Sequence, residues 1–121
     1  MDDIYDITII GGGPSGLYSA FYAGLRDLKT KIIEYKSTLG GKLHIYPEKI
    51  IWDIGGLPAT PAQQVMENLI EQGLTFNPTV CLNTKVDFVT KKDDVFVIET
   101  STGEKHFSKK VVVAVGGGII S

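Results

Sequence analysis

The sequence predicts an α/β domain of the Rossmann-like type, in which a parallel β-sheet carries helices and a smaller antiparallel β-meander is inserted. Three observations lead to this fold class. The apolar strand 4–10 runs directly into a glycine turn at 11–16 and an apolar helix. After residue 76 the spacing of hydrophobic residues changes from helical to alternating. A valine-rich strand at 111–113 then leads into a second glycine turn at 116–118.

The first three elements alternate strand, helix and strand. We expect strands at 4–10 and 30–34, with a helix at 14–27 between them. The unbroken apolar centre of the second strand is typical of a parallel sheet that is covered on both faces. Apolar or small residues recur along the helix at intervals of three or four, at Leu17, Phe21, Gly24 and Leu28.

The glycine turn after the first strand has the spacing G-x-G-x-x-G. Gly11 allows a sharp turn off the strand, and Gly13 allows a pyrophosphate to approach the backbone closely. Gly16 allows the helix to pack tightly on the strand. Pro14 stands near the first helical position, where a missing N–H does no harm. The free N–H groups and the dipole of such a helix start favour a bound phosphate.

An acidic residue follows at the position that this motif requires. Glu34 ends the apolar run Lys31–Glu34, 18 residues after Gly16. Its carboxylate can accept hydrogen bonds from both ribose hydroxyls and would repel a 2′-phosphate, which favours FAD or NAD over NADP. A glycine-rich turn that merely links strand and helix leaves the position of Glu34 unexplained.

The middle of the chain combines an irregular stretch with a second helix. Residues 36–60 contain two glycine pairs, two prolines and two aromatic residues, and loops of this length often bind a ligand. The helix that follows ends at Gly73. We expect Thr60 as its N-cap, Pro61 at its first position and Gln63 as the partner in a capping box.

The second half of the chain reads as strands. We expect a short strand at 76–82, and a meander of strands at 86–90, 95–100 and 105–108. Its turns are Lys92-Asp93-Asp94 and Ser101-Thr102-Gly103.

Composition excludes several classes of function. A net charge of −2 argues against nucleic-acid binding, and no apolar run approaches membrane-spanning length. The N-terminus lacks the basic segment of a signal peptide, and the lone Cys81 fits a reducing compartment, so we expect a cytoplasmic protein. No cluster of metal-ligand type is present. Lys42 does not complete a P-loop, because Lys36 and Leu43 stand where glycine and serine or threonine are needed.

Together these residues resemble the two-dinucleotide flavoproteins of the thioredoxin-reductase class, and most closely the type 2 ferredoxin–NADP reductases. The resemblance covers all 121 residues, whereas family members are well over twice as long. It therefore implies that residues 1–121 are the first part of an FAD-binding domain, without the NADPH domain and the C-terminal FAD segment. The matching segments are 5–16, 31–34, 39–43, 46–49 and 52–58.

The resemblance implies that the flavin carries the redox chemistry and that no side chain is itself catalytic. In that family NADPH gives a hydride to the flavin of FAD, and the reduced flavin passes single electrons to ferredoxin or flavodoxin. The protein binds and orients the cofactor and tunes its electronic properties. We expect the stretch 1–121 by itself to show little or no turnover.

The resemblance also assigns residues to the two halves of the FAD site. At the ADP half it implies Gly13, Pro14, Ser15 and Gly16 for the pyrophosphate, Glu34 for the ribose and the Val86 backbone for the adenine. At the flavin half it implies Gly41, Lys42 and Leu43 along the pyrophosphate and flavin edge, Tyr46 stacked on the ring system, Asp53 beside it, and Gly116 and Ile120 on the far side.

Three positions depart from the family pattern. Lys42 stands where the family usually has glutamine, and a lysine there can pair with a phosphate or stabilise an anionic reduced flavin. One residue fewer separates Leu43 from Tyr46, and Ala114-Val115-Gly116 replaces the more usual Ala-Thr-Gly. Tyr46 can also be read as a loop anchor, and Asp53 as a turn residue.

Two alternatives remain open at this point. A thioredoxin reductase would use the same domain to reduce a Cys-x-x-Cys motif, although the Y-P-E-K and D-I-G-G-L-P segments favour the ferredoxin reductases. A binding module without activity would pair with another chain to cover its unfinished sheet. Because an exposed apolar sheet edge invites association, we also expect a homodimer.

Overall fold

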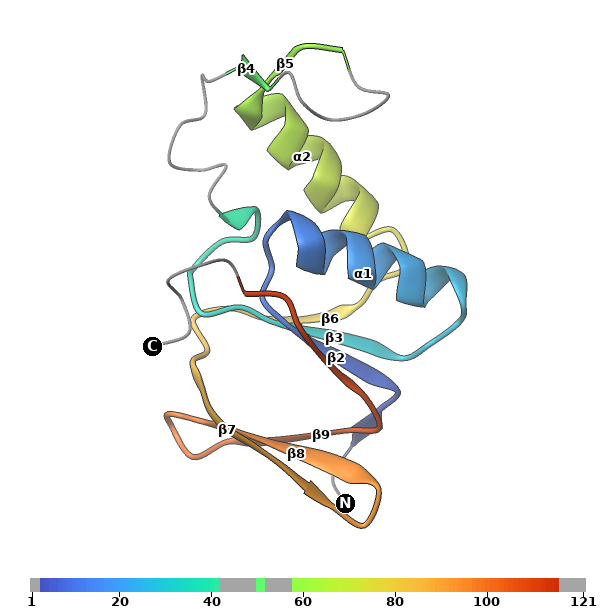
Figure 1. Ribbon diagram of the computed structural model, residues 1–121, viewed down its shortest axis with the longest axis vertical. Helices are drawn as coiled ribbons and strands as arrows, with labels where there is room; N and C mark the ends of the chain where they lie inside the picture. The colour runs from blue at the N-terminus through green and yellow to red at the C-terminus, as the bar shows by residue number, and fades with distance from the viewer. Residues whose placement is uncertain (1–2, 42–49, 52–57, 116–121) are drawn as a thin grey trace.

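The computed structural model describes residues 3–41, 50–51 and 58–115, which form three layers (Figure 1). Both helices lie on one side of a parallel sheet, with α1 against the sheet and α2 packed on α1, and a second sheet lies on the other side. The α/β class with an inserted meander is therefore confirmed. The helices are α1 (Pro14–Leu25) and α2 (Ala62–Gly73), and the strands are β1 (Ile4–Tyr5), β2 (Ile7–Ile10), β3 (Thr30–Ile33), β4 (Ile50–Ile51), β5 (Thr60–Pro61), β6 (Thr79–Cys81), β7 (Val86–Lys92), β8 (Val95–Thr100), β9 (Lys105–Ser108) and β10 (Val111–Val113).

The central sheet has the strand order β10-β2-β3-β6, and each neighbouring pair runs parallel. The chain moves outward from β2 through β3 to β6 and then returns to place β10 on the other side of β2. The strand order therefore reverses between β2 and β10. In open α/β sheets, ligands bind beside the carboxyl ends of the strands at such a switch point.

The main apolar core lies between this sheet and the helices. Ile9 and Ile32 face each other across β2 and β3 and are fully buried with Leu17 of α1. Close helix contacts depend on glycine, because a Cβ at Gly73 of α2 would lie 2.7 Å from Cδ2 of Leu17. Of the apolar stripe predicted for α1, Leu17 lies in this core, whereas Phe21 and Gly24 contact Phe76 and Leu28 lies beyond the helix end.

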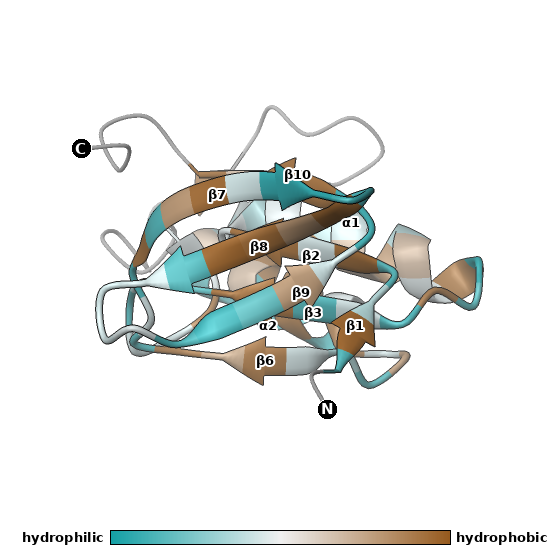
Figure 2. Ribbon diagram, turned by 90° about the horizontal axis from the view of Figure 1, so that it is seen from below, coloured by the Kyte–Doolittle hydropathy of each residue, from teal (hydrophilic) through white to brown (hydrophobic). Residues whose placement is uncertain are grey.

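The meander is a four-stranded sheet in the order β1-β9-β8-β7. Its strands β7, β8 and β9 are antiparallel as predicted, and hydrophobic residues concentrate along β8 (Figure 2). Asp93 and Asp94 turn the chain between β7 and β8 with φ of 53° and 67°. Two successive positive φ values are typical of a hairpin turn whose twist matches its strands.

The predicted single strand 4–10 is wrong in one respect, because it is divided between the two sheets. β1 pairs in parallel with β9, whereas β2 pairs with β3 and β10. The change occurs at Asp6, whose carboxylate accepts a hydrogen bond from the Lys29 backbone at 2.8 Å, while its own N–H donates to the Lys29 carbonyl at 2.9 Å. These local bonds hold the bend between the two strands.

The predicted start of α2 is also wrong. The N-cap is Pro61, with φ −58° and ψ 141°, and no side chain caps this fully described helix. The Thr60 hydroxyl donates instead to the Pro58 carbonyl at 2.6 Å, and Gln63 contacts Glu67. Thr60 is taken up by the short antiparallel pair of β4 and β5, which lies in a stretch predicted to be irregular.

Two further boundaries are narrower than predicted. α1 ends at Leu25, and Asp27 adopts a positive φ of 59°. Residues 76–78 stay out of the sheet: Asn77 has a φ of 54°, and Phe76 packs its ring against Phe21, with centroids 5.8 Å apart. Among the described residues, no helix is both long and apolar enough to cross a membrane.

Candidate functional site

The glycine turn lies at the switch point of the parallel sheet, between the end of β2 and the start of α1. Gly11 has a φ of +117°, and a Cβ there would lie 2.6 Å from the Ala114 carbonyl oxygen beyond β10. Its N–H donates to the Ile33 carbonyl at 2.8 Å. Gly11 is therefore fixed between two neighbouring strands, and its predicted turn conformation is confirmed.

Gly16 and Gly13 lack side chains for different reasons. A Cβ at Gly16 would lie 1.8 Å from the Gly11 carbonyl oxygen, so α1 can approach the strand only with glycine at this position. Among the described residues, a Cβ at Gly13 would meet only the Gly41 Cα, at the ordinary contact distance of 3.6 Å. The described part of the fold therefore has room for a side chain at position 13, and glycine there leaves that room to a ligand.

The start of α1 carries a partial positive charge that no acidic residue of its own first turn balances. Pro14 is its first residue, as predicted, and Gly13 is its N-cap. Within α1, all of which is described, no side chain caps the N-terminus and no acidic residue lies in the first turn. The N–H groups of Ser15 and Gly16 belong to this first turn, where a helix provides no internal acceptor. Such an end suits an anionic group.

Glu34 follows β3 directly and is held by the backbone on both sides. Glu34 is buried, with only 7% of its surface exposed. Oε1 accepts a hydrogen bond from the Gly12 N–H at 2.7 Å, and Oε2 accepts one from the Lys36 N–H at 2.8 Å. Each carboxylate oxygen can accept a further hydrogen bond. The two backbone donors therefore orient the carboxylate and leave it able to receive two hydroxyl groups.

No role was predicted for Gly12 from the sequence, although roles were predicted for the other glycines of the motif. A Cβ at Gly12 would lie 2.5 Å from Cδ2 of Leu39 and 3.2 Å from Oε1 of Glu34. The available signal was the unbroken run of three glycines, because the middle one has no task in the G-x-G-x-x-G spacing. Its task here is to bring the turn and the acidic residue into direct contact.

The loop after Glu34 folds back onto the glycine turn. The Gly40 N–H donates to the Gly12 carbonyl at 2.8 Å. Gly41 has a φ of +61°, and a Cβ on it would lie 3.0 Å from the Gly13 Cα. The structure thus brings Gly41 beside Gly13, although the two lie in different segments of the sequence.

Val86 lies at the start of β7, close in sequence to a segment that is bonded to Glu34. The Thr84 N–H donates to the Glu34 carbonyl at 2.9 Å, and the Asn83 N–H donates to the Lys36 carbonyl at 2.8 Å. The segment from β6 to β7 therefore passes beside Glu34 two residues before Val86. The other predicted site residues lie outside the described residues: Lys42, Leu43, Tyr46, Asp53, Gly116 and Ile120.

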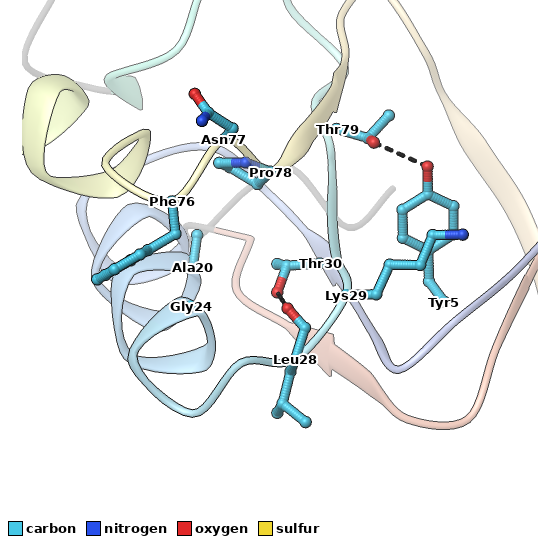
Figure 3. Close-up of a pocket in the computed structure, with 10 residues that line it drawn as sticks. All are labelled: Tyr5, Ala20, Gly24, Leu28, Lys29, Thr30, Phe76, Asn77, Pro78 and Thr79. Carbon is cyan, nitrogen blue, oxygen red and sulfur yellow. Dashed lines mark hydrogen bonds between the residues drawn. The ribbon is translucent and has the colours of Figure 1, made fainter.

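A second concave region lies at the opposite end of the parallel strands (Figure 3). Its volume is about 320 Å³, and Phe76, Lys29 and Tyr5 are among its lining residues. The Tyr5 hydroxyl is 2.7 Å from Oγ1 of Thr79. The Lys29 ammonium, which is the one cationic group among these lining residues, is paired with Asp3.

Other groups that could carry chemistry do not form a catalytic set. Cys81 is a free, partly buried cysteine, and burial raises the pKa of its thiol. Among the described residues, no three histidine, cysteine, aspartate or glutamate side chains are grouped to hold a metal ion. The glycine turn with Glu34 is therefore the candidate site.

Comparison with known proteins agrees with this geometry. The family model for pyridine nucleotide-disulphide oxidoreductases matches residues 5–120. The chain belongs to this family. The family resemblance inferred from the motifs at 5–16 and 31–34 is thereby confirmed.

Curated relatives are similar along the whole chain. Ferredoxin–NADP reductase 1 of Bacillus thuringiensis (strain Al Hakam) is 58% identical, over 99% of this chain and 35% of the relative. Ferredoxin–NADP reductase 3 of Lysinibacillus sphaericus (strain C3-41) is 59% identical, over 100% of this chain and 35% of the relative. The chain thus spans about a third of the length of these family members.

Solved structures show the same arrangement in other oxidoreductases. The thioredoxin reductase of Streptococcus pyogenes MGAS5005 has a TM-score of 0.83 at 25% identity, covering 96% of this chain and 36% of that chain. The thioredoxin reductase of T. acidophilum has a TM-score of 0.83 at 19% identity, covering 93% of this chain and 36% of that chain, which supports the fold alone.

Proposed function

We propose that residues 1–121 supply the FAD-binding part of a flavin oxidoreductase that passes electrons from NADPH to ferredoxin or flavodoxin. The observation that carries this proposal is that two backbone N–H groups orient the Glu34 carboxylate beside the glycine turn at the switch point of the sheet. The names of the relatives that are 58% and 59% identical support the reaction class. Because the chain spans 35% of their length, the proposal assigns it cofactor binding and not the whole reaction.

The described residues fit the ADP half of FAD. The space beside Gly13 that a Cβ would fill allows a pyrophosphate to reach the backbone. The N–H groups of Ser15 and Gly16 would donate to the phosphate oxygens, and Pro14 would fix the helix start. Glu34 would accept hydrogen bonds from the ribose hydroxyls, and it would repel the 2′-phosphate of NADP at this position.

The remaining assignments extend the site toward the flavin. We place the Val86 backbone at the adenine and Gly41 at the pyrophosphate, next to Gly13. FAD, when bound, would supply both the hydride acceptor and the single-electron donor. The residues proposed for its flavin half and far side remain predictions: Lys42, Leu43, Tyr46, Asp53, Gly116 and Ile120.

A thioredoxin-reductase function would use the same half-site, so the glycine turn does not separate the two activities. The two thioredoxin reductases are 25% and 19% identical to this chain, whereas the two ferredoxin–NADP reductases are 58% and 59% identical. We therefore favour the latter. We also propose a cytoplasmic homodimer, in keeping with the free Cys81 and with the exposed Val113 on the edge strand β10.

Titration of the purified chain with FAD and with FMN tests this function. FMN has the same flavin but lacks the adenylate half, which is the part that Glu34 and the glycine turn would bind. We expect FAD to bind at least about tenfold more tightly, a difference of about 1.4 kcal/mol. Flavin fluorescence or calorimetry would measure both affinities. Equal affinities for the two flavins would contradict the proposed role of the ADP half-site.

A further inference from the structure

A buried polar contact joins the two sheets, away from the glycine turn. Lys31 of β3 is only 8% exposed, and its Nζ lies 2.8 Å from Nδ1 of His106 in β9. The same Nζ lies 4.2 Å from the centre of the Tyr5 ring in β1. A single ammonium group therefore contacts two strands of the meander sheet from the parallel sheet.

The chemistry of this contact assigns the proton on His106. A lysine ammonium has only donors, so Nδ1 of His106 must be the acceptor and carries no proton. The neutral ring then holds its proton on Nε2, which lies 3.7 Å from Oε1 of Glu104. Nε2 is buried and has no hydrogen-bond partner among the described residues. A second proton on the ring would turn Nδ1 into a donor that faces the ammonium.

The charges around His106 favour its neutral form. Burial, followed by the Lys31 charge, holds the pKa of His106 below its usual value, against an opposing effect of Glu104. On β6, burial raises the pKa of the Cys81 thiol, which therefore stays protonated at neutral pH. On β1, Tyr5 presents its ring to Lys31, and the ammonium of Lys29 lies 4.6 Å from the same ring.

The contact lies on the strands that lead to the dinucleotide site. Lys31 is three residues before Glu34, and the meander begins just after the segment whose Thr84 N–H donates to the Glu34 carbonyl. The Ser101 N–H donates to the Lys85 carbonyl at 2.9 Å, which ties the end of β8 to this segment. The segment before Val86 is therefore bonded both to Glu34 and to the meander, so a shift of the meander would strain its bond to Glu34.

We propose that His106 is a positioning residue for the dinucleotide site: its neutral ring accepts the Lys31 hydrogen bond and fixes the meander sheet against the parallel sheet. This role rests on the proposed function as far as cofactor binding is concerned. Protonation of His106 replaces the hydrogen bond to Lys31 by repulsion and loosens the contact between the two sheets. The segment before Val86 then binds the dinucleotide less tightly.

The dependence on pH has a definite sign. Because the folded-state pKa of His106 lies below 6.5, its ordinary value, the unfolded chain takes up the proton first as the pH falls. The stabilisation is therefore complete above pH 6.5 and is lost as the pH falls through the folded-state pKa. Linkage to one proton limits the change in any equilibrium constant to about tenfold per pH unit.

Nuclear magnetic resonance and thermal unfolding test the contact without any cofactor. In the full chain with ¹⁵N-labelled histidine, we expect the Nε2–H tautomer for His106 and a melting temperature that falls below pH 6.5. His106→Asn should flatten this fall, because its amide oxygen can accept from Lys31 and does not titrate. His106→Leu should lower the melting temperature at every pH. His44→Asn controls for the other histidine and should keep the wild-type profile.

FAD affinity across the same pH range tests the positioning role. We expect the Kd of the wild type to rise below pH 6.5 and that of His106→Asn to change less. An Nδ1–H tautomer, or the same pH dependence of unfolding in His106→Asn and wild type, would overturn the contact. If FAD affinity depended on pH in the same way in His106→Asn and in the wild type, the positioning role of His106 would be overturned, while the proposed function would stand. Absence of FAD binding at pH 7.5 would overturn the proposed function and positioning together, while the tautomer would still report the contact.

Discussion

Replacing Gly16 by alanine is expected to lower the free energy of unfolding by at least about 3 kcal/mol, or to prevent folding. The added Cβ would lie 1.8 Å from the Gly11 carbonyl oxygen and 3.3 Å from Cγ2 of Ile9. The nearest of these atoms belongs to the backbone of the turn, so no side-chain rotation can relieve the overlap. Chemical denaturation monitored by circular dichroism would measure the loss.

Gly13→Ala is the matched control for this substitution. Gly13 has an ordinary φ of −81°, and its Cβ would meet the Gly41 Cα at 3.6 Å. We expect a loss of about 1 kcal/mol, because alanine is a clearly poorer N-cap than glycine but its Cβ overlaps no described backbone atom. A Gly16→Ala variant that is no less stable than Gly13→Ala would show that the close approach of helix and strand is not needed.

Glu34→Gln is expected to reduce the free energy of unfolding by about 1–3 kcal/mol. It should also reduce the ratio of NAD to NADP affinity, because the charge that repels the 2′-phosphate is removed. The carboxylate accepts from Gly12 at 2.7 Å and from Lys36 at 2.8 Å. A glutamine keeps one acceptor, but turns its NH₂ group toward the other backbone N–H. Denaturation and the ratio of NAD to NADP affinities would measure the two effects.

Glu67→Gln is the control for the charge change, because Glu67 is exposed on α2 and its side chain accepts a long hydrogen bond, at 3.4 Å, from Gln63. Substitutions at exposed sites of this kind usually change stability by less than about 0.5 kcal/mol. If Glu34→Gln matched this control in stability and in nucleotide preference, the proposed role of the oriented carboxylate would be wrong.

The parts of the fold that the sequence predicted well are those where backbone geometry restricts the residue type. Gly11 needs a positive φ and Gly16 has no room for a Cβ, so their spacing marks a strand, a turn and a helix. The turn at Asp93 and Asp94 is similarly local. These features can be predicted from a short segment, because they depend on residues that are close together in the sequence.

The errors arise where residues distant in the sequence compete with a local preference. Asp6 divides an apolar run because it bonds to Lys29, which no local pattern reveals. Thr60 has the right residue type for an N-cap, but it pairs with β4 instead.

The contacts that complete the candidate site and the inter-sheet layer are also long-range. Gly12 and Glu34 meet only because β2 and β3 are neighbours. Lys31 and His106 are 75 residues apart. The motif residues proposed to bind a dinucleotide could therefore be predicted from the sequence. The long-range hydrogen bonds that position them could not.

Amide chemical-shift mapping with ADP tests the central claim most directly. ADP carries the pyrophosphate and the adenosine ribose, so it probes the half-site formed by the described residues. We expect the largest shifts at Gly13, Ser15, Gly16 and Glu34. Shifts confined instead to the cavity beside Phe76 and Lys29, or no saturable shifts at the glycine turn, would contradict the claim that this turn and Glu34 bind a dinucleotide.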